Sequence, residues 1–440
     1  MSPPAPPGTW RRRGPLAVAL AILFVAVGVL VAWSSRHSAG HLVYALDDAY
    51  IHMAMARNLA GHGVFGVTRY GFTSSSSSPL WTLLLAGLFA LLGPRDWLPL
   101  ALNVLFAASL LAVADRVLQA HGVRPPSRLL ALVAVVVFTP LPPLVLVGQE
   151  HVLHATLTLA FAGLLTLAPP RAALLLIAPA LTAMRYEGLF LVFIACLVLA
   201  ARRRFAFALA LGVVSLLPPA LYGLVSLAHG WYALPNPVIL KGALGEGLTG
   251  WRRIALVPFL GGWGELARTP HVLALVALAA VTLLARWRSP SSREGTLLIV
   301  FIGTAILHLQ YARTGWFYRY EAYLVALGIV AAAVALDGLG DRVRPRWLPV
   351  ALASAVALVC AVRGVRVAVI YERWLDPAGG IPTEWVRAGR WRVASNVVLG
   401  DRTVAFYAVD PAEAEPLADH LRAFAPELPP GVAQLGFYTR

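Results

Sequence analysis

The chain carries little charge for its length. Only 13% of its 440 residues are Asp, Glu, Lys or Arg, whereas 59% are hydrophobic. A soluble chain carries roughly a quarter charged residues, so this composition excludes an ordinary soluble domain. It indicates a membrane protein whose apolar side chains face lipid. The apolar runs are continuous rather than alternating in polarity, which excludes a transmembrane β-barrel.

Cysteine is scarce, and the common cofactor motifs are missing. Cys196 and Cys360 lie inside apolar runs, so we expect buried thiols and no disulfide. Zinc-type spacing, a Walker motif and a dinucleotide fingerprint are absent. Asp47, Asp48 and Glu150 carry the oxygen ligands that a hard divalent cation prefers. Their spacing defines no metal site, so we assign no metal and leave the cofactor unknown.

Acidic residues are outnumbered, and the net charge is +15, almost all from arginine. In a soluble chain this excess would indicate nucleic acid, but in a membrane protein arginine anchors the cytoplasmic loops. We therefore expect no nucleic-acid partner. Arginines 11–13 precede an apolar run from Gly14 to Trp33 that is long enough to span a bilayer. This pattern predicts an uncleaved first helix with a cytoplasmic N-terminus.

Twelve apolar runs predict the topology. They lie near residues 15–33, 79–92, 97–118, 129–147, 151–168, 172–184, 187–200, 205–227, 271–286, 295–311, 321–336 and 347–370. The arginine clusters between them all face the cytoplasm only if one early run does not cross. Residues 79–92 are short enough to form a re-entrant or interfacial helix. The short runs 172–184 and 187–200 are expected to meet at an outer turn.

The resulting fold class is an all-α polytopic membrane protein with about 11 transmembrane helices. Residues 1–370 form the membrane domain, and residues 34–96 form its first outer loop with interfacial helices. Residues 371–440 form a short extracytoplasmic tail, either a small α/β appendage or a loosely packed segment. The serine run 74–78 within the outer loop is expected to be a flexible linker.

Two adjacent acids open the first outer loop. Asp47 and Asp48 precede Ile51, Met55 and Leu59, whose spacing predicts an amphipathic interfacial helix. One Asp is expected to cap this helix. The other is then a candidate catalytic base, because paired carboxylates at a membrane face are costly to desolvate without a function.

Other polar residues fall on the same predicted face. His52 follows Asp48 by one helical turn and either orients it or is a plain interfacial histidine. Glu150 either pairs with an arginine or contacts substrate. Arg185 and Glu187 either neutralise each other or bind substrate.

Basic and aromatic residues add further candidates to this face. Lys241 follows Pro235 and Pro237 and is either a solvated lysine or a phosphate contact. Arg319 and Tyr320 lie in an aromatic stretch that is either an interfacial belt or a phosphate site, because guanidinium matches phosphate geometry.

The first-loop string, LDDAYIHMAMARNLAGHGVFGVTRYGFTSSSSSPLWTLLLA, resembles that of GT-C membrane glycosyltransferases. The nearest resemblance is to the mycobacterial-type terminal β-(1→2) arabinofuranosyltransferase group and its bacterial relatives. The later pieces GQEH, RYEGL, PNPVILK and FYRYEAYL also resemble segments of this group. The resemblance is scattered over residues 40–330 and is most specific in the first loop. The serine run departs from the group's shorter segment before the proline.

The resemblance implies an inverting, GT-C-like glycosyltransferase at the outer face of the bacterial cytoplasmic membrane. Its donor would be a polyprenyl-phosphate-linked sugar, and its acceptor a cell-envelope glycan, lipid or protein. Asp47 or Asp48 would be the base. The expected phosphate contacts are Arg319, Lys241 and Arg185, and the expected substrate contacts are His52, Glu150, Glu187 and Tyr320. The alternative is a transporter or flippase for an anionic lipid-linked head group, which would need polar residues reaching both faces.

Overall fold

The computed structural model describes residues 9–38, 40–166, 172–241, 268–285, 292–315, 318–339, 351, 353–363, 392–399 and 402–408. The chain divides into two compact units, Met1–Tyr371 and Glu372–Arg440. The first unit contains the apolar helices. In the described part of the second, β1 (Arg392–Leu399) pairs antiparallel with β2 (Arg402–Ala408), with a register irregularity between Val393 and Ser395. The sequence left the fold of this tail open, and its described residues form strands.

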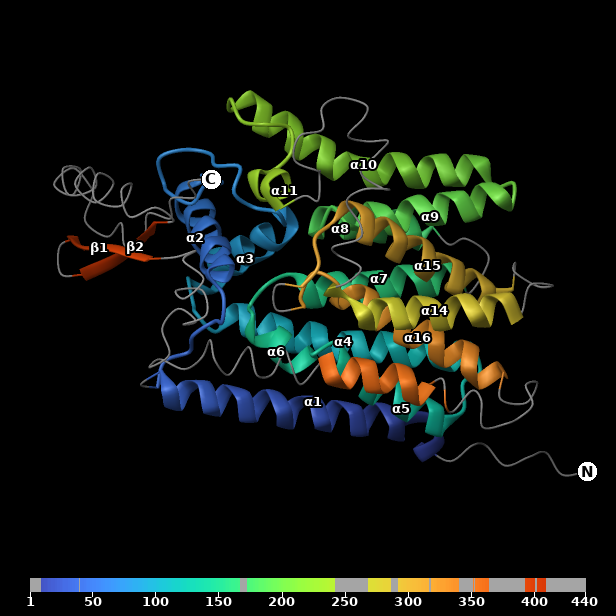
Figure 1. Cartoon of the computed structure of the whole chain (residues 1–440). Helices are drawn as coiled ribbons and strands as arrows, with labels where there is room; N and C mark the ends of the chain where they lie inside the picture. The colour runs from blue at the N-terminus through green and yellow to red at the C-terminus, as the bar shows by residue number, and fades with distance from the viewer. Residues whose placement is uncertain are drawn as a thin grey trace, which may run out of the picture. The chain divides into compact units, whose positions relative to one another are not determined.

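All the regular secondary structure among the described residues of the first unit is helical (Figure 1). Its helices are α1 (Thr9–His37), α2 (Asp47–His62), α3 (Pro79–Leu92), α4 (Leu98–Ala120), α5 (Pro125–Phe138), α6 (Leu141–Leu146), α7 (His151–Thr166), α8 (Ala173–Met184), α9 (Gly188–Ala201), α10 (Phe205–Ala228), α11 (Asn236–Lys241), α14 (Pro270–Ala285), α15 (Arg293–Tyr311) and α16 (Ala322–Leu339). An apolar helix, Ala353–Arg363, follows.

Four described helices are long and apolar enough to cross a membrane: Arg13–Arg36, Leu98–Ala120, Phe205–Ala228 and Arg293–Tyr311. Eight shorter apolar helices accompany them in the described part of the chain. The class of helical membrane protein is thus confirmed. Helix α3 has the bounds of the short run predicted not to cross, and its role in the membrane stays a prediction.

Proline sets several helix boundaries. The helices α3, α4 and α5 each carry proline in their first turn, where a backbone N–H has no helical partner in any case. The predicted run 129–147 is not one helix, because it divides into α5 and α6 around Pro140. Pro142 and Pro143 follow in the first turn of α6. Pro140 is the N-cap of α6 and has no backbone N–H with which to continue α5.

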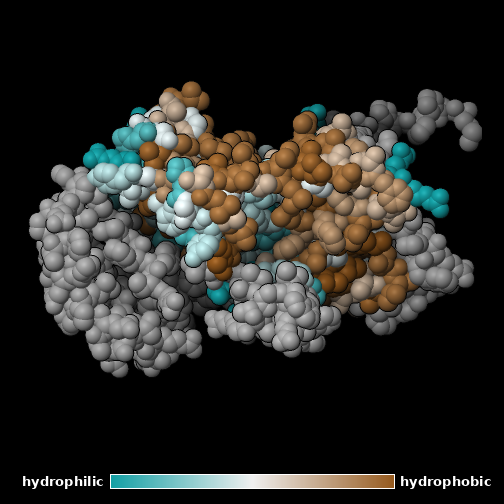
Figure 2. Space-filling model, turned by 90° about the horizontal axis from the view of Figure 1, so that it is seen from above, coloured by the Kyte–Doolittle hydropathy of each residue, from teal (hydrophilic) through white to brown (hydrophobic). Residues whose placement is uncertain are grey.

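The long helices lie side by side, with α1 and α10 at opposite edges, and α2 runs across one end of the bundle (Figure 1). Helices α7 and α16 are buried along most of their described length. Helix α10 instead exposes Leu209, Leu216, Leu221 and Leu224. Figure 2 shows this hydrophobic surface in brown. Leucines exposed in such number cover a face suited to lipid contact.

The acids of the predicted outer face and the arginine clusters lie at opposite helix ends. Helix α9 begins directly after Glu187 and ends directly before arginines 202–204. Helix α16 begins directly after Glu321, and near its other end Asp337 forms an ion pair with Arg124 at 3.0 Å. The described acids of the predicted outer face therefore lie at the helix ends opposite these arginines.

Candidate functional site

The two neighbouring acids lie in the first turn of α2 and differ in environment. Asp47 is exposed, and its carboxylate accepts a hydrogen bond from the backbone N–H of Asp48 at 3.0 Å. The Asp48 side chain is 17% exposed and forms an ion pair with Arg319. Asp47 therefore occupies the helix start, where negative charge is favourable, and Asp48 turns toward the interior.

Arg319 connects α2 to the segment before α16. Its guanidinium is buried, donates to the side-chain oxygen of Gln149 at 2.6 Å and to the Tyr320 hydroxyl at 3.0 Å, and lies 4.9 Å from the Tyr320 ring centre. Burial alone would lower the pKa of Arg319, but Tyr320 and Asp48 raise it. The buried guanidinium therefore stays charged and is held by a carboxylate, an amide and a phenol.

A second buried arginine joins two glutamates. Arg185 lies in the turn between α8 and α9 and contacts both Glu150 and Glu187 at 2.6 Å. Burial raises the pKa of Glu187, but the charge and hydrogen bonds of Arg185 outweigh that effect and lower it to about 2. The structure contains both pairings considered from the sequence, since Arg185 neutralises Glu187 and Glu150 together.

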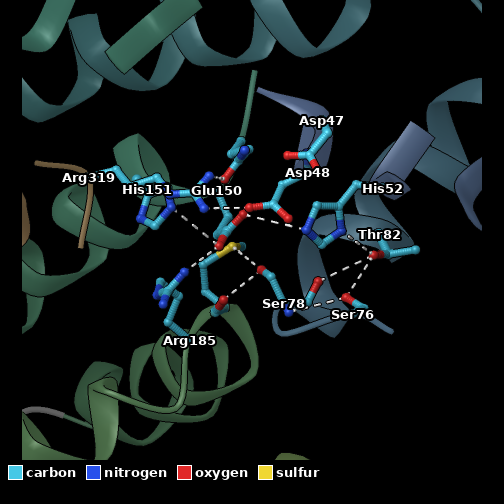
Figure 3. A network of polar contacts seen from close by, with 12 residues as sticks. Asp47, Asp48, His52, Ser76, Ser78, Thr82, Glu150, His151, Arg185 and Arg319 are labelled. Carbon is cyan, nitrogen blue, oxygen red and sulfur yellow. Dashed lines mark hydrogen bonds and ion pairs between the residues drawn. The ribbon is translucent and has the colours of Figure 1, made fainter. Parts of the chain in front are cut away.

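His52 contacts two groups outside its own helix, and the expectation that it orients Asp48 stays a prediction. Its Nε2 lies 3.8 Å from a Glu150 oxygen, and its Nδ1 lies 3.0 Å from the Thr82 hydroxyl. The Ser76 hydroxyl lies 3.1 Å from Thr82 and accepts from the backbone N–H of Ser78 at 3.1 Å. Figure 3 shows this chain beside the Glu150–Arg185 pair.

The Thr82 hydroxyl joins these groups. It lies 3.0 Å from His52 Nδ1 and 3.1 Å from the Ser76 hydroxyl, and it donates to the backbone oxygen of Ser78 at 3.4 Å. A hydroxyl has one proton to donate and two lone pairs that accept, so Thr82 can serve several partners at once. These contacts hold the His52 ring in place next to Glu150.

The serine run is not a flexible linker, which corrects that expectation. Ser74, Ser76 and Ser78 are each 0% exposed, whereas Ser75 and Ser77 are only partly buried. Ser78 donates to the Met184 backbone oxygen at 2.6 Å. Alternate burial is the period-two pattern of extended chain. A homopolymeric run gives no hydropathy contrast between alternate positions, so the sequence did not reveal it.

The cluster retains unused hydrogen-bonding capacity. Four of its buried atoms have no hydrogen-bond partner among the described residues: Gln149 Nε2, Glu150 Oε2, His151 Nε2 and Arg319 Nε. Buried polar atoms without partners are costly in a finished core. Their concentration here is consistent with a site that binds a polar ligand.

The remaining candidates are placed as follows. Tyr320 lies between the two arginines, since the Arg185 guanidinium is 5.3 Å from its ring centre and that of Arg319 is 4.9 Å away. Lys241 ends α11, and its side chain lies outside the described residues.

Within the described part of the chain, no group of three His, Cys, Asp or Glu residues is arranged to hold a metal ion. Thr82 and Ser76 were missed, because single hydroxyl residues carry no distinctive sequence signal.

Comparisons of this chain with protein-family models, with curated proteins and with solved structures found no match. The class that the fold supports is therefore a helical membrane protein with a buried acid–arginine cluster at one end of its bundle.

Proposed function

We propose that the protein is an integral-membrane inverting glycosyltransferase of the GT-C type. It moves a sugar from a polyprenyl-phosphate donor to a glycan, lipid or protein of the cell envelope, at the outer face of the bacterial cytoplasmic membrane. The observation that carries the proposal is the meeting of Asp48, Glu150, Arg185 and Arg319 at one end of an apolar bundle. Buried ionised groups in membrane proteins commonly mark a functional site.

Asp47 and Asp48 have different roles in this proposal. The exposed Asp47 carboxylate takes the proton of the acceptor hydroxyl as the hydroxyl oxygen attacks the anomeric carbon. The bond from that carbon to the phosphate oxygen breaks, and polyprenyl phosphate leaves with the electron pair. Asp48 instead holds Arg319, because its carboxylate is already paired with that guanidinium.

The unused polar atoms of the cluster suit sugar hydroxyls. Glu150 Oε2 accepts a hydrogen bond, and Gln149 Nε2 and Arg319 Nε donate one. A sugar presents hydroxyl groups that do both, so a bound sugar satisfies the atoms that the protein leaves unpaired.

The test is transfer from a polyprenyl-phosphate sugar by the purified protein in lipid nanodiscs, across a panel of donor sugars. Asp47→Asn is expected to lower the rate by about 10²–10⁴-fold, the usual contribution of a general base. Asp337→Asn is the matched control, because Asp337 lies at the opposite helix end. Full transfer activity in both Asp47→Asn and Asp48→Asn would refute the proposal. Movement of the lipid-linked donor across the bilayer without transfer would support a flippase.

A further inference from the structure

Three segments that lie far apart in the sequence bring the polar cluster together. Asp48 lies at the start of α2, Gln149 and Glu150 lie in the turn before α7, and Arg319 lies shortly before α16. Arg319 contacts both other segments, through Asp48 and through Gln149 at 2.6 Å. Polar groups keep such a geometry only where packing fixes the backbone that carries them.

The residues that precede these polar groups pack on one another. Leu46 directly precedes the acid pair of α2, and Val147 lies in the turn before α7. Tyr318 directly precedes Arg319, and its φ of 55° lies in the left-handed region that non-glycine residues rarely adopt. Such strain persists only where surrounding contacts enforce it. The side chains of Leu46, Val147 and Tyr318 form one buried hydrophobic cluster, so an apolar contact joins the same three segments.

Tyr44 and Gly148 make a close contact between two of these segments. Tyr44 is 3% exposed, and a Cβ atom added to Gly148 would lie 2.4 Å from its ring. Gly148 also has a φ of 71°, a left-handed conformation that glycine adopts readily. This position therefore requires glycine for two reasons, its backbone conformation and the space that the Tyr44 ring occupies.

Hydrogen bonds fix Tyr44 at its hydroxyl end and at its backbone. The hydroxyl donates to the backbone oxygen of Asp96 at 2.5 Å and accepts from the backbone N–H of Leu100, in the first turn of α4, at 3.0 Å. The backbone N–H of Tyr44 donates to the hydroxyl of Tyr50, a residue of α2, at 2.9 Å. One side chain thus connects the start of α4, the helix α2 and the turn before α7.

We propose that Tyr44, packed on Gly148, is a positioning residue that sets the distance between the acid pair of α2 and the turn that carries Gln149 and Glu150. It acts through the backbone of these segments. Its effect on a reaction rests on the proposed function, in which both segments face one substrate. A misplacement of about 1 Å between groups that act together can lower a rate about 10²-fold.

The test is Gly148→Ala, with Gly122→Ala as the matched control. Both glycines have a positive φ, 71° and 76°, so both substitutions strain the backbone. Within the described part of the chain, a methyl group added to Gly122 meets nothing within 4 Å beyond its neighbours in the chain, whereas one added to Gly148 meets the Tyr44 ring. Gly122 also lies in the turn between α4 and α5, at the far end of α4.

Under the proposed function, Gly148→Ala should lower kcat for sugar transfer about 10- to 100-fold with the donor KM nearly unchanged. Gly122→Ala should keep the kcat of the unaltered protein. Tyr44→Phe keeps the ring and removes the hydroxyl that ties it to α4, so kcat should fall about fivefold, again at constant KM. Tyr44→Phe decides the outcome if melting temperatures show that Gly148→Ala does not fold. Unchanged kcat in the folded variants would overturn the positioning role.

A second readout does not depend on activity. Spin labels are attached to the full-length protein at Arg57→Cys, exposed on α2, and at Trp97→Cys, directly before α4 and 51% exposed, with no other cysteine present. Gly148→Ala should shift or broaden the distance between the labels, and Gly122→Ala should not. An unchanged distance in Gly148→Ala would overturn the proposal. If the unaltered protein transfers no sugar, the proposed function fails, and this measurement alone decides the role of Tyr44.

Discussion

At the scale of single residues, His52 shows how residues distant in the sequence fix the position of a side chain. Its ring is buried, with Thr82 on one nitrogen and Glu150 near the other. Neither partner is close to His52 in the sequence, so an inspection of its own helix favoured Asp48 instead. The hydrogen-bond chain through Ser76 and Thr82 makes His52 a positioned group rather than a general interfacial histidine.

Thr82→Val tests this positioning, since it keeps the shape of the side chain and removes the hydroxyl. Under the proposed function, we expect kcat to fall about fivefold with KM nearly unchanged, because a lost neutral hydrogen bond is worth about 1 kcal/mol. The pH profile of kcat should also shift, since His52 loses its Nδ1 partner. Thr82→Ser should restore the rate. An unchanged profile in Thr82→Val would assign Thr82 a purely structural role.

Glu187 predicts a dependence of stability on pH. Its folded-state pKa is about 2, below the ordinary value of 4.5. A lowered folded-state pKa contributes stability that is full above the ordinary value and is lost as the pH falls toward 2. Glu187→Gln should therefore be less stable than the unaltered protein at neutral pH, and the difference should shrink between pH 4.5 and 2. Melting temperatures in detergent across this window measure it, and a constant difference would contradict the assigned pKa.

At the scale of elements, the serine run shows that a low-complexity segment can be specifically packed. Extended chain sends alternate side chains to opposite faces, and here the even-numbered serines are the buried ones. Ser74 contacts Tyr222 of α10, and Ser78 contacts the end of α8. The segment therefore links α3 to two helices that lie far from it in the sequence.

Burial alternates along the serine run, so substitutions at the partly exposed serines are controls for a substitution at a buried one. Ser78→Ala removes a buried hydrogen bond of 2.6 Å to the Met184 backbone oxygen and should destabilise the protein by about 1 kcal/mol. Ser75→Ala and Ser77→Ala alter partly exposed serines and should stay within about 0.5 kcal/mol of the unaltered protein. Thermal unfolding of the three variants measures the pattern. Equal effects at all three positions would show that the run is not held as the structure describes.

At the scale of the whole membrane unit, charge is sorted between the two helix ends. The acids of the cluster and its two buried arginines lie at one end, and the arginines that follow α9 lie at the other. The positive-inside rule assigns the second end to the cytoplasm. Under the proposed function, the site is expected to face outward, and this orientation stays a prediction.

Cysteine labelling tests this orientation. Tyr70 is 62% exposed in the loop after α2, and Arg203 is exposed in the turn after α9. A membrane-impermeant maleimide should label Tyr70→Cys on intact cells, and should label Arg203→Cys only after permeabilisation. The protein without added cysteine is the background control, since Cys196 and Cys360 lie in apolar helices. Labelling of both variants from outside would contradict the orientation.

Much of the helical framework was predictable. Long uninterrupted apolar runs have one stable solution in a bilayer, because a helix satisfies its own backbone hydrogen bonds. The positions of α3, α8, α9 and α10 therefore followed within a few residues of the predicted runs. The break between α5 and α6 was missed because hydropathy weighs apolar character and ignores the hydrogen bond that Pro140 lacks.

The sequence by itself determined the protein class, the helix positions and the gathering of polar residues at one end, because these depend on local hydropathy and charge. Only the tertiary structure decided which acid pairs with which arginine. Asp48 pairs with Arg319 across 271 positions of chain, and Glu150 shares Arg185 with Glu187. Which acid meets which base depends on how helices pack, and each pairing changes the charge left for a ligand.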